Sequence, residues 1–131
     1  MNTERICIAG GPSAGKTTYA MQLSTDVIYH TDDLIENHSW SEASQIASEW
    51  FNEPGPWIVE GVAVPRALRK WLAANESKKP CDKIIWMNGS FVELSPGQSA
   101  MVKGCKTVWN EIVDDLHNRD VEIVEIGNSE K

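Results

Sequence analysis

A short stretch near the amino terminus carries the residue types needed to hold a phosphate chain. It reads Gly10-Gly11-Pro12-Ser13-Ala14-Gly15-Lys16-Thr17-Thr18. Glycine, any four residues, glycine, lysine and then threonine is the pattern of a phosphate-binding loop. Glycine permits backbone angles at which successive N–H groups turn toward phosphate oxygens. Lys16 would place a positive charge on the β- and γ-phosphates, and the Thr17 hydroxyl would ligate Mg²⁺. We therefore expect residues 10–18 to bind a nucleotide.

The sequence on either side of this loop agrees with that function. The apolar run Ile6–Ala9 before it predicts a buried strand of a parallel sheet. Residues Thr18–Ser24 after it predict a helix, whose positive amino-terminal end would face the same phosphates. The alternative is a glycine-rich turn that only joins strand to helix. A random chain of this length matches the pattern with a probability of roughly half a percent, so we favour nucleotide binding.

Acidic residues come at the ends of the next predicted strands. Val27–His30 predicts the second strand, with Asp32 and Asp33 after it, and Trp57–Gly61 predicts the third, with Glu60 near its end. In open α/β sheets, ligands bind at the carboxyl ends of the strands. We expect Asp32 to orient or deprotonate an attacking hydroxyl group, and Asp33 and Glu60 to support Mg²⁺. The alternatives are that an aspartate caps the following helix, and that an acid ends a strand by chance.

Arginines share one face of the next predicted helix. This helix covers Val64–Ala74, with Pro65 in its first turn, where proline is tolerated. Arg66 and Arg69 are three residues apart and therefore lie on the same side. Beside an active site they would clamp an anionic acceptor or the transferring phosphoryl group. Elsewhere they would form an ordinary solvated face. Of the pair, Arg66 is the one we expect at the acceptor.

The segment from Asn88 to Lys106 lacks regular periodicity and contains loop-forming residues. A long loop at this edge of the sheet predicts a lid over residues 88–106 that excludes water during transfer. Lys103 and Lys106 are its only basic residues, and they are candidate lid contacts. By contrast, Thr107–His117 predicts a helix whose apolar face packs in the core.

The remaining segments predict supporting elements. They are a helix over Ser41–Phe51 with Ser41 as its N-cap, a turn over Asn52–Pro56, a fourth strand over Lys83–Met87 and a last strand over Val121–Ile126. A nucleotide base would rest near Gly127-Asn128, where the last strand ends. The histidines His30, His38 and His117 have no metal-ligand spacing, and we expect them to be structural or solvated.

Bulk composition restricts the class of protein. The chain of 131 residues is 41% hydrophobic and 24% charged, which predicts a single soluble domain over 1–131. Without an apolar run as long as a membrane span, and without a signal peptide, we expect a cytoplasmic protein. The formal net charge of −7 argues against broad attraction to nucleic acid, although a local basic groove is compatible with it.

These motifs together resemble those of the small P-loop kinases, the superfamily that includes adenylate, shikimate and gluconate kinases. Thr31-Asp32-Asp33-Leu34 is similar to the acceptor-site aspartate motif of several such kinases. Glu60-Gly61, with Pro65-Arg66 shortly after, is similar to the Asp-Gly-x-Pro-Arg segment of adenylate kinases, with extra residues between. In those enzymes the arginine binds the phosphate of the acceptor, which implies that role for Arg66.

The resemblance implies a fold and a reaction. The fold is the three-layer P-loop NTPase fold, an α/β architecture in which a five-stranded parallel sheet of order 2-3-1-4-5 has helices on both faces. The reaction is ATP- and Mg²⁺-dependent transfer of the γ-phosphoryl group to a small acceptor, such as a nucleoside, a nucleotide or a hydroxylated metabolite. Compact kinases of this kind also act on nucleic-acid ends or modified bases, which the net charge disfavours here.

The predicted lid departs from that family. Its members carry lid arginines that stabilise the transferring phosphate, whereas here no arginine occurs between Arg69 and Arg119. Lys103 and Lys106 could substitute, although lysine lacks the bidentate geometry of arginine. Arg119 could approach from the end of the last helix. This departure keeps open a second function, a nucleotide-binding regulatory or switch protein without an acceptor. The absence of an Asn-Lys-x-Asp motif favours ATP over GTP.

Replacement of Lys16 by alanine is expected to abolish Mg²⁺-ATP binding, because it removes a charge-assisted contact with the phosphates. Isothermal titration calorimetry measures the affinity. Lys79→Ala, in the predicted polar loop Asn75–Pro80, is the matched control and should bind as the wild type does. Equal affinities for the two variants would contradict the assignment of the loop.

Overall fold

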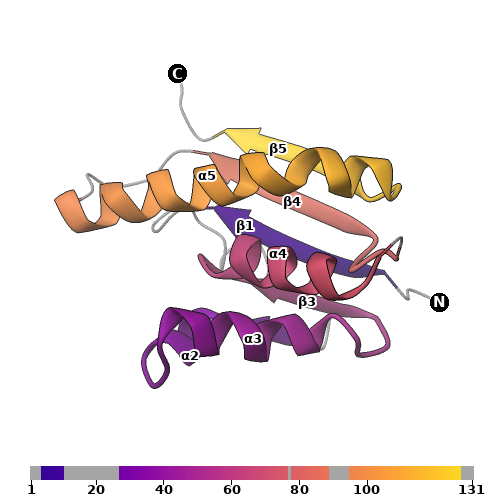
Figure 1. Cartoon of the computed structure of the whole chain (residues 1–131), viewed down its shortest axis with the longest axis horizontal. Helices are drawn as coiled ribbons and strands as arrows, with labels where there is room; N and C mark the ends of the chain where they lie inside the picture. Colours follow the sequence, from indigo (N-terminus) through magenta and orange to yellow (C-terminus); the bar gives the residue numbers. More distant parts are fainter. Residues whose placement is uncertain (1–3, 11–26, 77, 89–94, 128–131) are drawn as a thin grey trace.

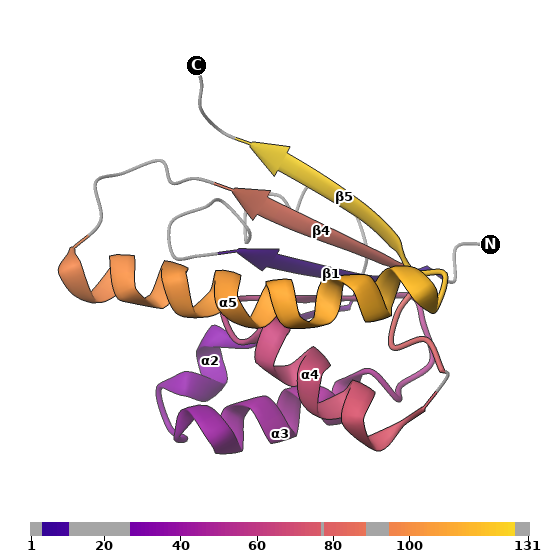
Figure 2. The same ribbon diagram turned by 45° about the horizontal axis from the view of Figure 1, so that its top comes forward.

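The computed structural model describes residues 4–10, 27–76, 78–88 and 95–127. The strands are β1 (Arg5–Gly10), β2 (Ile28–His30), β3 (Trp57–Glu60), β4 (Lys83–Asn88) and β5 (Glu122–Gly127). The helices are α2 (Asp32–Ile35), α3 (Trp40–Trp50), α4 (Val64–Ala74) and α5 (Pro96–Asn118). Figures 1 and 2 show these helices lying along the sheet.

The strands form one parallel sheet of order β2-β3-β1-β4-β5, which confirms the predicted order 2-3-1-4-5. The register aligns His30 with Glu60, and Glu60 with Ile8. It also aligns Gly10 with Met87. All strands therefore end at one side of the sheet, which we call the carboxyl edge.

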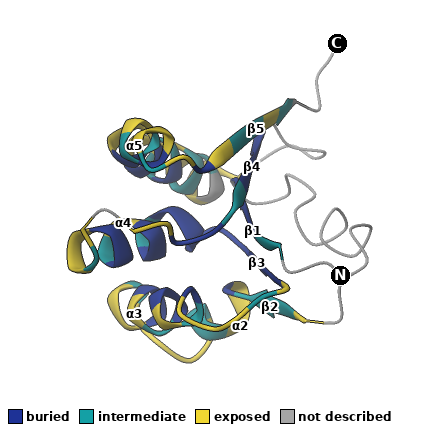
Figure 3. Cartoon of the chain, turned by 90° about the vertical axis from the view of Figure 1, so that its right-hand side faces the viewer, coloured by how far each residue is buried: buried dark blue, intermediate teal, exposed yellow. Residues whose placement is uncertain are grey.

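Alternating side chains of the central strands divide the core between the two faces of the sheet. On β1, Cys7 and Ala9 pack into the larger cluster, which also contains buried residues from α3, α4 and α5. Ile6 and Ile8 belong to a second cluster with Ile58 of β3. The described helices all cover the first face (Figure 3). The helix predicted at residues 18–24 lies outside the described residues, so the expected second layer is untested. None of the described helices is long and apolar enough to cross a membrane.

Helix α3 starts at Trp40, one residue before the predicted start, and its N-cap is Ser39 instead of the predicted Ser41. The Glu42 backbone N–H donates to Ser39 Oγ at 3.2 Å, and the Ser39 N–H donates to Glu42 Oε1 at 3.0 Å. This reciprocal pair is a capping box, which requires an acid or amide three residues after the cap. The backbone N–H of Ser39 is also the main reason why the pKa of Glu42 is lowered.

The loop predicted over residues 88–106 is wrong for residues 96–106, because α5 is a continuous helix of 23 residues that begins at Pro96. Proline fits the first turn of a helix, where its missing N–H leaves no bond unmade. The Ser99 N–H donates to the Ser95 carbonyl at 2.9 Å, which closes that turn. Apolar residues at helical spacing then pack on the core along its length; they are Met101, Cys105, Trp109, Ile112 and Leu116. The part of the lid over residues 89–94 lies outside the described residues.

Arg119 holds the carboxyl end of α4 at the side of the sheet opposite the carboxyl edge. Its guanidinium donates to the carbonyls of Leu72, Asn75 and Lys78 at 3.3, 2.5 and 2.9 Å. Its Nε donates to Asp115 Oδ1 at 3.0 Å, and the side chain is only 10% exposed. The last carbonyls of a helix have no partner within the helix, so this arginine supplies one.

Arg119→Ala is expected to lower the free energy of unfolding by about 2–3 kcal/mol, because it strips charged donors from carbonyls at a helix end. Arg69→Ala is the matched control. It removes only an exposed pair with Glu111 (48% and 52% exposed), and it should cost less than about 1 kcal/mol. Urea unfolding measures both variants, and equal losses would contradict the role given to Arg119.

Candidate active site

The candidate site lies at the carboxyl edge, where β2, β3 and β1 end side by side. Three sequence features meet there. β1 ends at Gly10, the first residue of the phosphate-binding motif, and β3 ends at Glu60. Asp32 follows β2 after a single intervening residue, Thr31. These features are far apart in the sequence. The order of the strands in the sheet makes them neighbours in space.

Gly10 is required by the close approach of a neighbouring strand. A Cβ at this position would lie 2.6 Å from the Met87 carbonyl oxygen of β4, closer than packed atoms come. The contact with β4 therefore fixes the position of the first residue of the motif, at the middle of the sheet. The rest of it, Gly11 to Thr18, lies outside the described residues, as do its predicted ligand groups on Lys16 and Thr17.

The turn formed by Thr31 and Asp32 lies directly over Gly61. The Thr31 N–H donates to the Glu60 carbonyl at 2.9 Å. In return, the Val62 N–H donates to Asp32 Oδ1 at 3.3 Å and the Ala63 N–H donates to Thr31 Oγ1 at 3.4 Å. These bonds join the end of β2 to the start of α4 and hold the Asp32 carboxylate beside the end of β3.

Asp32 and Asp33 form the first turn of α2 and do not cap it. The N-cap position belongs to Thr31, whose side chain makes no capping bond to this helix. Both aspartates are exposed. Since one oxygen of Asp32 accepts from Val62, its carboxylate is oriented by the neighbouring loop. Asp33, the predicted metal ligand, is the next residue of the same short helix.

Glu60 is almost fully buried, with 1% of its side chain exposed, and it contacts a histidine that we expected to be structural or solvated. His30 Nδ1 and Glu60 Oε2 form a short hydrogen-bonded contact between the last residues of adjacent strands. His30 is 33% exposed. The sequence contained the signal for this pair, because His30 and Glu60 end neighbouring predicted strands.

A carboxylate at this position fits a magnesium site that is completed by the nucleotide. Mg²⁺ is commonly bound by one or two carboxylates, waters and the phosphates of a substrate, without a dedicated protein cage. In the part of the chain that the structure describes, no group of three or more His, Cys, Asp or Glu side chains could hold a metal ion. Thr17, Glu60 and Asp33 stay the predicted ligands of Mg²⁺, and Thr17 lies outside the described residues.

Arg66 reaches from the first turn of α4 toward the start of α3. Its Cζ lies 4.8 Å from the ring centroid of Trp40, a cation–π contact. Its Nη2 would be 3.1 Å from a Cβ added at Gly104, so the glycine of α5 makes room for the guanidinium. Arg66 is therefore held at the carboxyl edge, and its contact with an acceptor stays a prediction. Trp40 was not predicted to take part.

The other basic residues predicted at the site make contacts elsewhere or are exposed. Arg69 Nη1 donates to Glu111 Oε2 at 2.8 Å on the exposed surface of α5, which favours the solvated-face alternative. Lys106 Nζ lies 5.1 Å from the ring centroid of Trp86, and Lys103 is exposed on α5. Arg119 lies at the opposite side of the sheet and does not approach the site.

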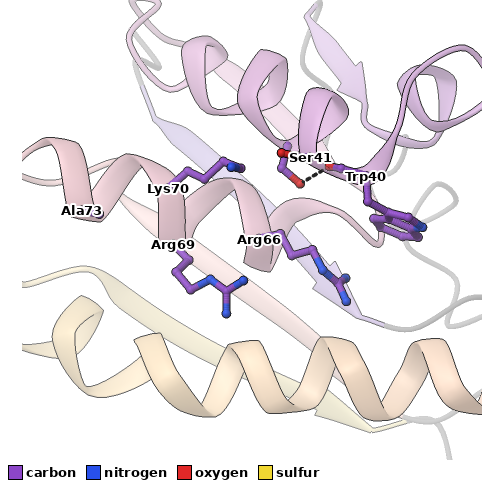
Figure 4. A pocket seen from close by; sticks show the side chains of 7 residues that line it. Trp40, Ser41, Arg66, Arg69, Lys70 and Ala73 are labelled. Atoms are coloured by element: carbon purple, nitrogen blue, oxygen red, sulfur yellow. Dashed lines mark hydrogen bonds between the residues drawn. The ribbon is translucent and has the colours of Figure 1, made fainter.

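A groove of about 440 Å³ runs between α3 and α4. Its walls include Trp40, Ser41 and Ser44 from α3 and Arg66, Arg69 and Lys70 from α4. In Figure 4, Lys70 points from α4 toward Ser41, whereas Arg69 points toward α5. We call this feature the α3–α4 groove. Its volume is in the range of sites for small ligands.

No protein-family model matches the sequence, and no curated protein matches it either.

Gly61→Ala is expected to destabilise the fold by about 2 kcal/mol or more, because it forces strain on the backbone and on the turn above it. The φ angle of Gly61 is 138°, and an added Cβ would lie 1.8 Å from Thr31 Oγ1. Gly97→Ala is the matched control, since its added Cβ meets nothing closer than Ser95 Oγ at 4.0 Å. It should change the stability by less than about 1 kcal/mol. Similar thermal unfolding of the two variants would contradict the role of Gly61.

Proposed function

We propose that this protein is a P-loop kinase that transfers the γ-phosphoryl group of ATP to a hydroxyl or phosphate acceptor. The observation that carries the proposal is the convergence of three features at one edge of the sheet. The phosphate-binding motif begins at the end of β1, Glu60 ends the adjacent β3, and Asp32 follows β2 beyond it. Strand ends at this edge are where α/β proteins of this type bind their ligands.

Each residue has a distinct task in the proposed reaction. Lys16 and the backbone of residues 10–18 bind the phosphates. Asp32, oriented by the Val62 N–H, holds the acceptor hydroxyl and takes up its proton. Arg66, fixed against Trp40, binds the anionic part of the acceptor or the transferring group. Mg²⁺, held by Thr17 and Glu60, would neutralise charge that develops on the phosphate oxygens.

A nucleotide-binding switch is the second candidate function, and the arrangement of arginines favours it. Arg69 is paired with Glu111 and Arg119 binds the end of α4, so neither is available to the transferring phosphate. Among the described residues, Arg66 is the arginine that remains near the carboxyl edge. A switch would hydrolyse ATP at a rate that does not depend on any acceptor, whereas a kinase would turn over faster in the presence of its acceptor.

The test of the proposed function is ATP consumption with and without a panel of nucleosides, nucleotides and sugars. Asp32→Asn is expected to keep Mg²⁺-ATP binding and to lower acceptor-dependent turnover by roughly 100-fold or more, because the amide cannot take up the proton. Glu36→Gln, an exposed acid at the end of the same helix α2, is the matched control and should turn over normally. Normal turnover by Asp32→Asn would show that the base is another residue.

A further inference from the structure

The α3–α4 groove concentrates positive charge in a chain that is acidic as a whole. The formal net charge is −7, with 19 acidic residues. Between Gly61 and Asn75, however, the chain carries Arg66, Arg69 and Lys70 and no acidic residue. A local cluster of this kind attracts anions even when the net charge does not.

The groove begins at the candidate active site and leads away from it. Helices α3 and α4 lie side by side, and both begin at the carboxyl edge (Figures 1 and 2). Trp40 is the first residue of α3, and Arg66 stands in the first turn of α4. From Arg66 to Ala73, which also lines the groove, a helix advances about 10 Å. An acceptor longer than one nucleotide could therefore extend along this path.

The cations in the groove are not equivalent. Arg66 and Lys70 are four residues apart and lie on neighbouring turns of one helix face. Arg69 is already paired with Glu111. Glu42 of α3 does not line this groove but a neighbouring pocket that it shares with Lys70, and its carboxylate accepts the Ser39 N–H in capping α3. Successive cations beside an aromatic ring are the pattern by which proteins follow the backbone of a single strand and stack its bases.

We propose that the α3–α4 groove binds the end of a single-stranded nucleic acid and that this end is the phosphoryl acceptor. The inference rests on the proposed kinase function. The terminal hydroxyl oxygen attacks the γ-phosphorus of ATP, and a new oxygen–phosphorus bond forms. The bond from the γ-phosphorus to the β–γ bridging oxygen breaks, and ADP leaves with that electron pair. The proton of the hydroxyl passes to Asp32. The backbone phosphates beyond the terminus lie against Arg66 and Lys70, and Ala73 and Ser41 are exposed, which leaves the distal path open.

The first test is fluorescence polarisation with a labelled single-stranded oligonucleotide of about ten nucleotides. Lys70→Glu is expected to weaken binding roughly tenfold and to reduce the slope of log affinity against log salt by about 0.7 for each lost phosphate contact. Lys79→Glu makes the same charge change on an exposed residue outside the groove, and it should weaken binding much less. Equal affinities for these two variants would overturn the proposal.

A gain of affinity provides a test that misfolding cannot imitate. Glu111→Gln removes the exposed negative partner of Arg69, so this variant should bind the oligonucleotide more tightly than the wild type does. Thymidine monophosphate should displace the labelled oligonucleotide only weakly. The comparison is with unlabelled oligonucleotide at the same total concentration of nucleotides. If the mononucleotide competes as well as the strand, the groove holds a single nucleotide and the proposal is wrong.

Two further measurements on the same samples separate this inference from the proposed function. Wild-type protein should transfer a γ-phosphoryl label from ATP to the oligonucleotide, and binding without transfer would contradict the assignment of the acceptor. Mg²⁺-ATP binding by calorimetry, together with no oligonucleotide binding, would overturn this inference and leave the kinase proposal standing. Groove-dependent oligonucleotide binding without ATP binding would contradict the kinase proposal and leave the groove as a nucleic-acid site.

Discussion

The close contact between the Thr31–Asp32 turn and Gly61 is the constraint on which the carboxyl edge depends. The turn can lie there only because residue 61 has no Cβ, and the backbone N–H groups that follow Gly61 donate to the turn. The same contact brings the start of α4, and with it Arg66, beside the end of β2. A single missing side chain thus couples the predicted base, the predicted magnesium ligand and the predicted acceptor contact.

Much of the scaffold could be predicted because local sequence and tertiary packing agree. The helix Val64–Ala74 was predicted with the bounds that the structure has, since Pro65 fits a first turn and the apolar residues recur at helical spacing. The buried strands β1, β3 and β4 are short apolar runs bounded by turns. Their order came from the resemblance to P-loop kinases, because pairing between distant strands leaves no local signal.

The differences have physical causes that a linear reading misses. Gly97 and Gly104 make residues 96–106 look irregular, yet the amphipathic spacing from Met101 onward overrides the low helix propensity of glycine. His30 matters through a partner thirty residues away on the adjacent strand. Arg69 and Arg119 carry the charge that a phosphate site needs, but ion pairing and helix capping, decided by tertiary structure, direct them elsewhere.

The most direct test of the account is a crystal structure of the protein with Mg²⁺ and a non-hydrolysable ATP analogue. The account predicts that the triphosphate binds at the end of β1, with its terminal phosphate on the side of Asp32 and the metal ion on the side of Glu60. A nucleotide bound away from the carboxyl edge, or no bound nucleotide at a saturating concentration, would contradict it.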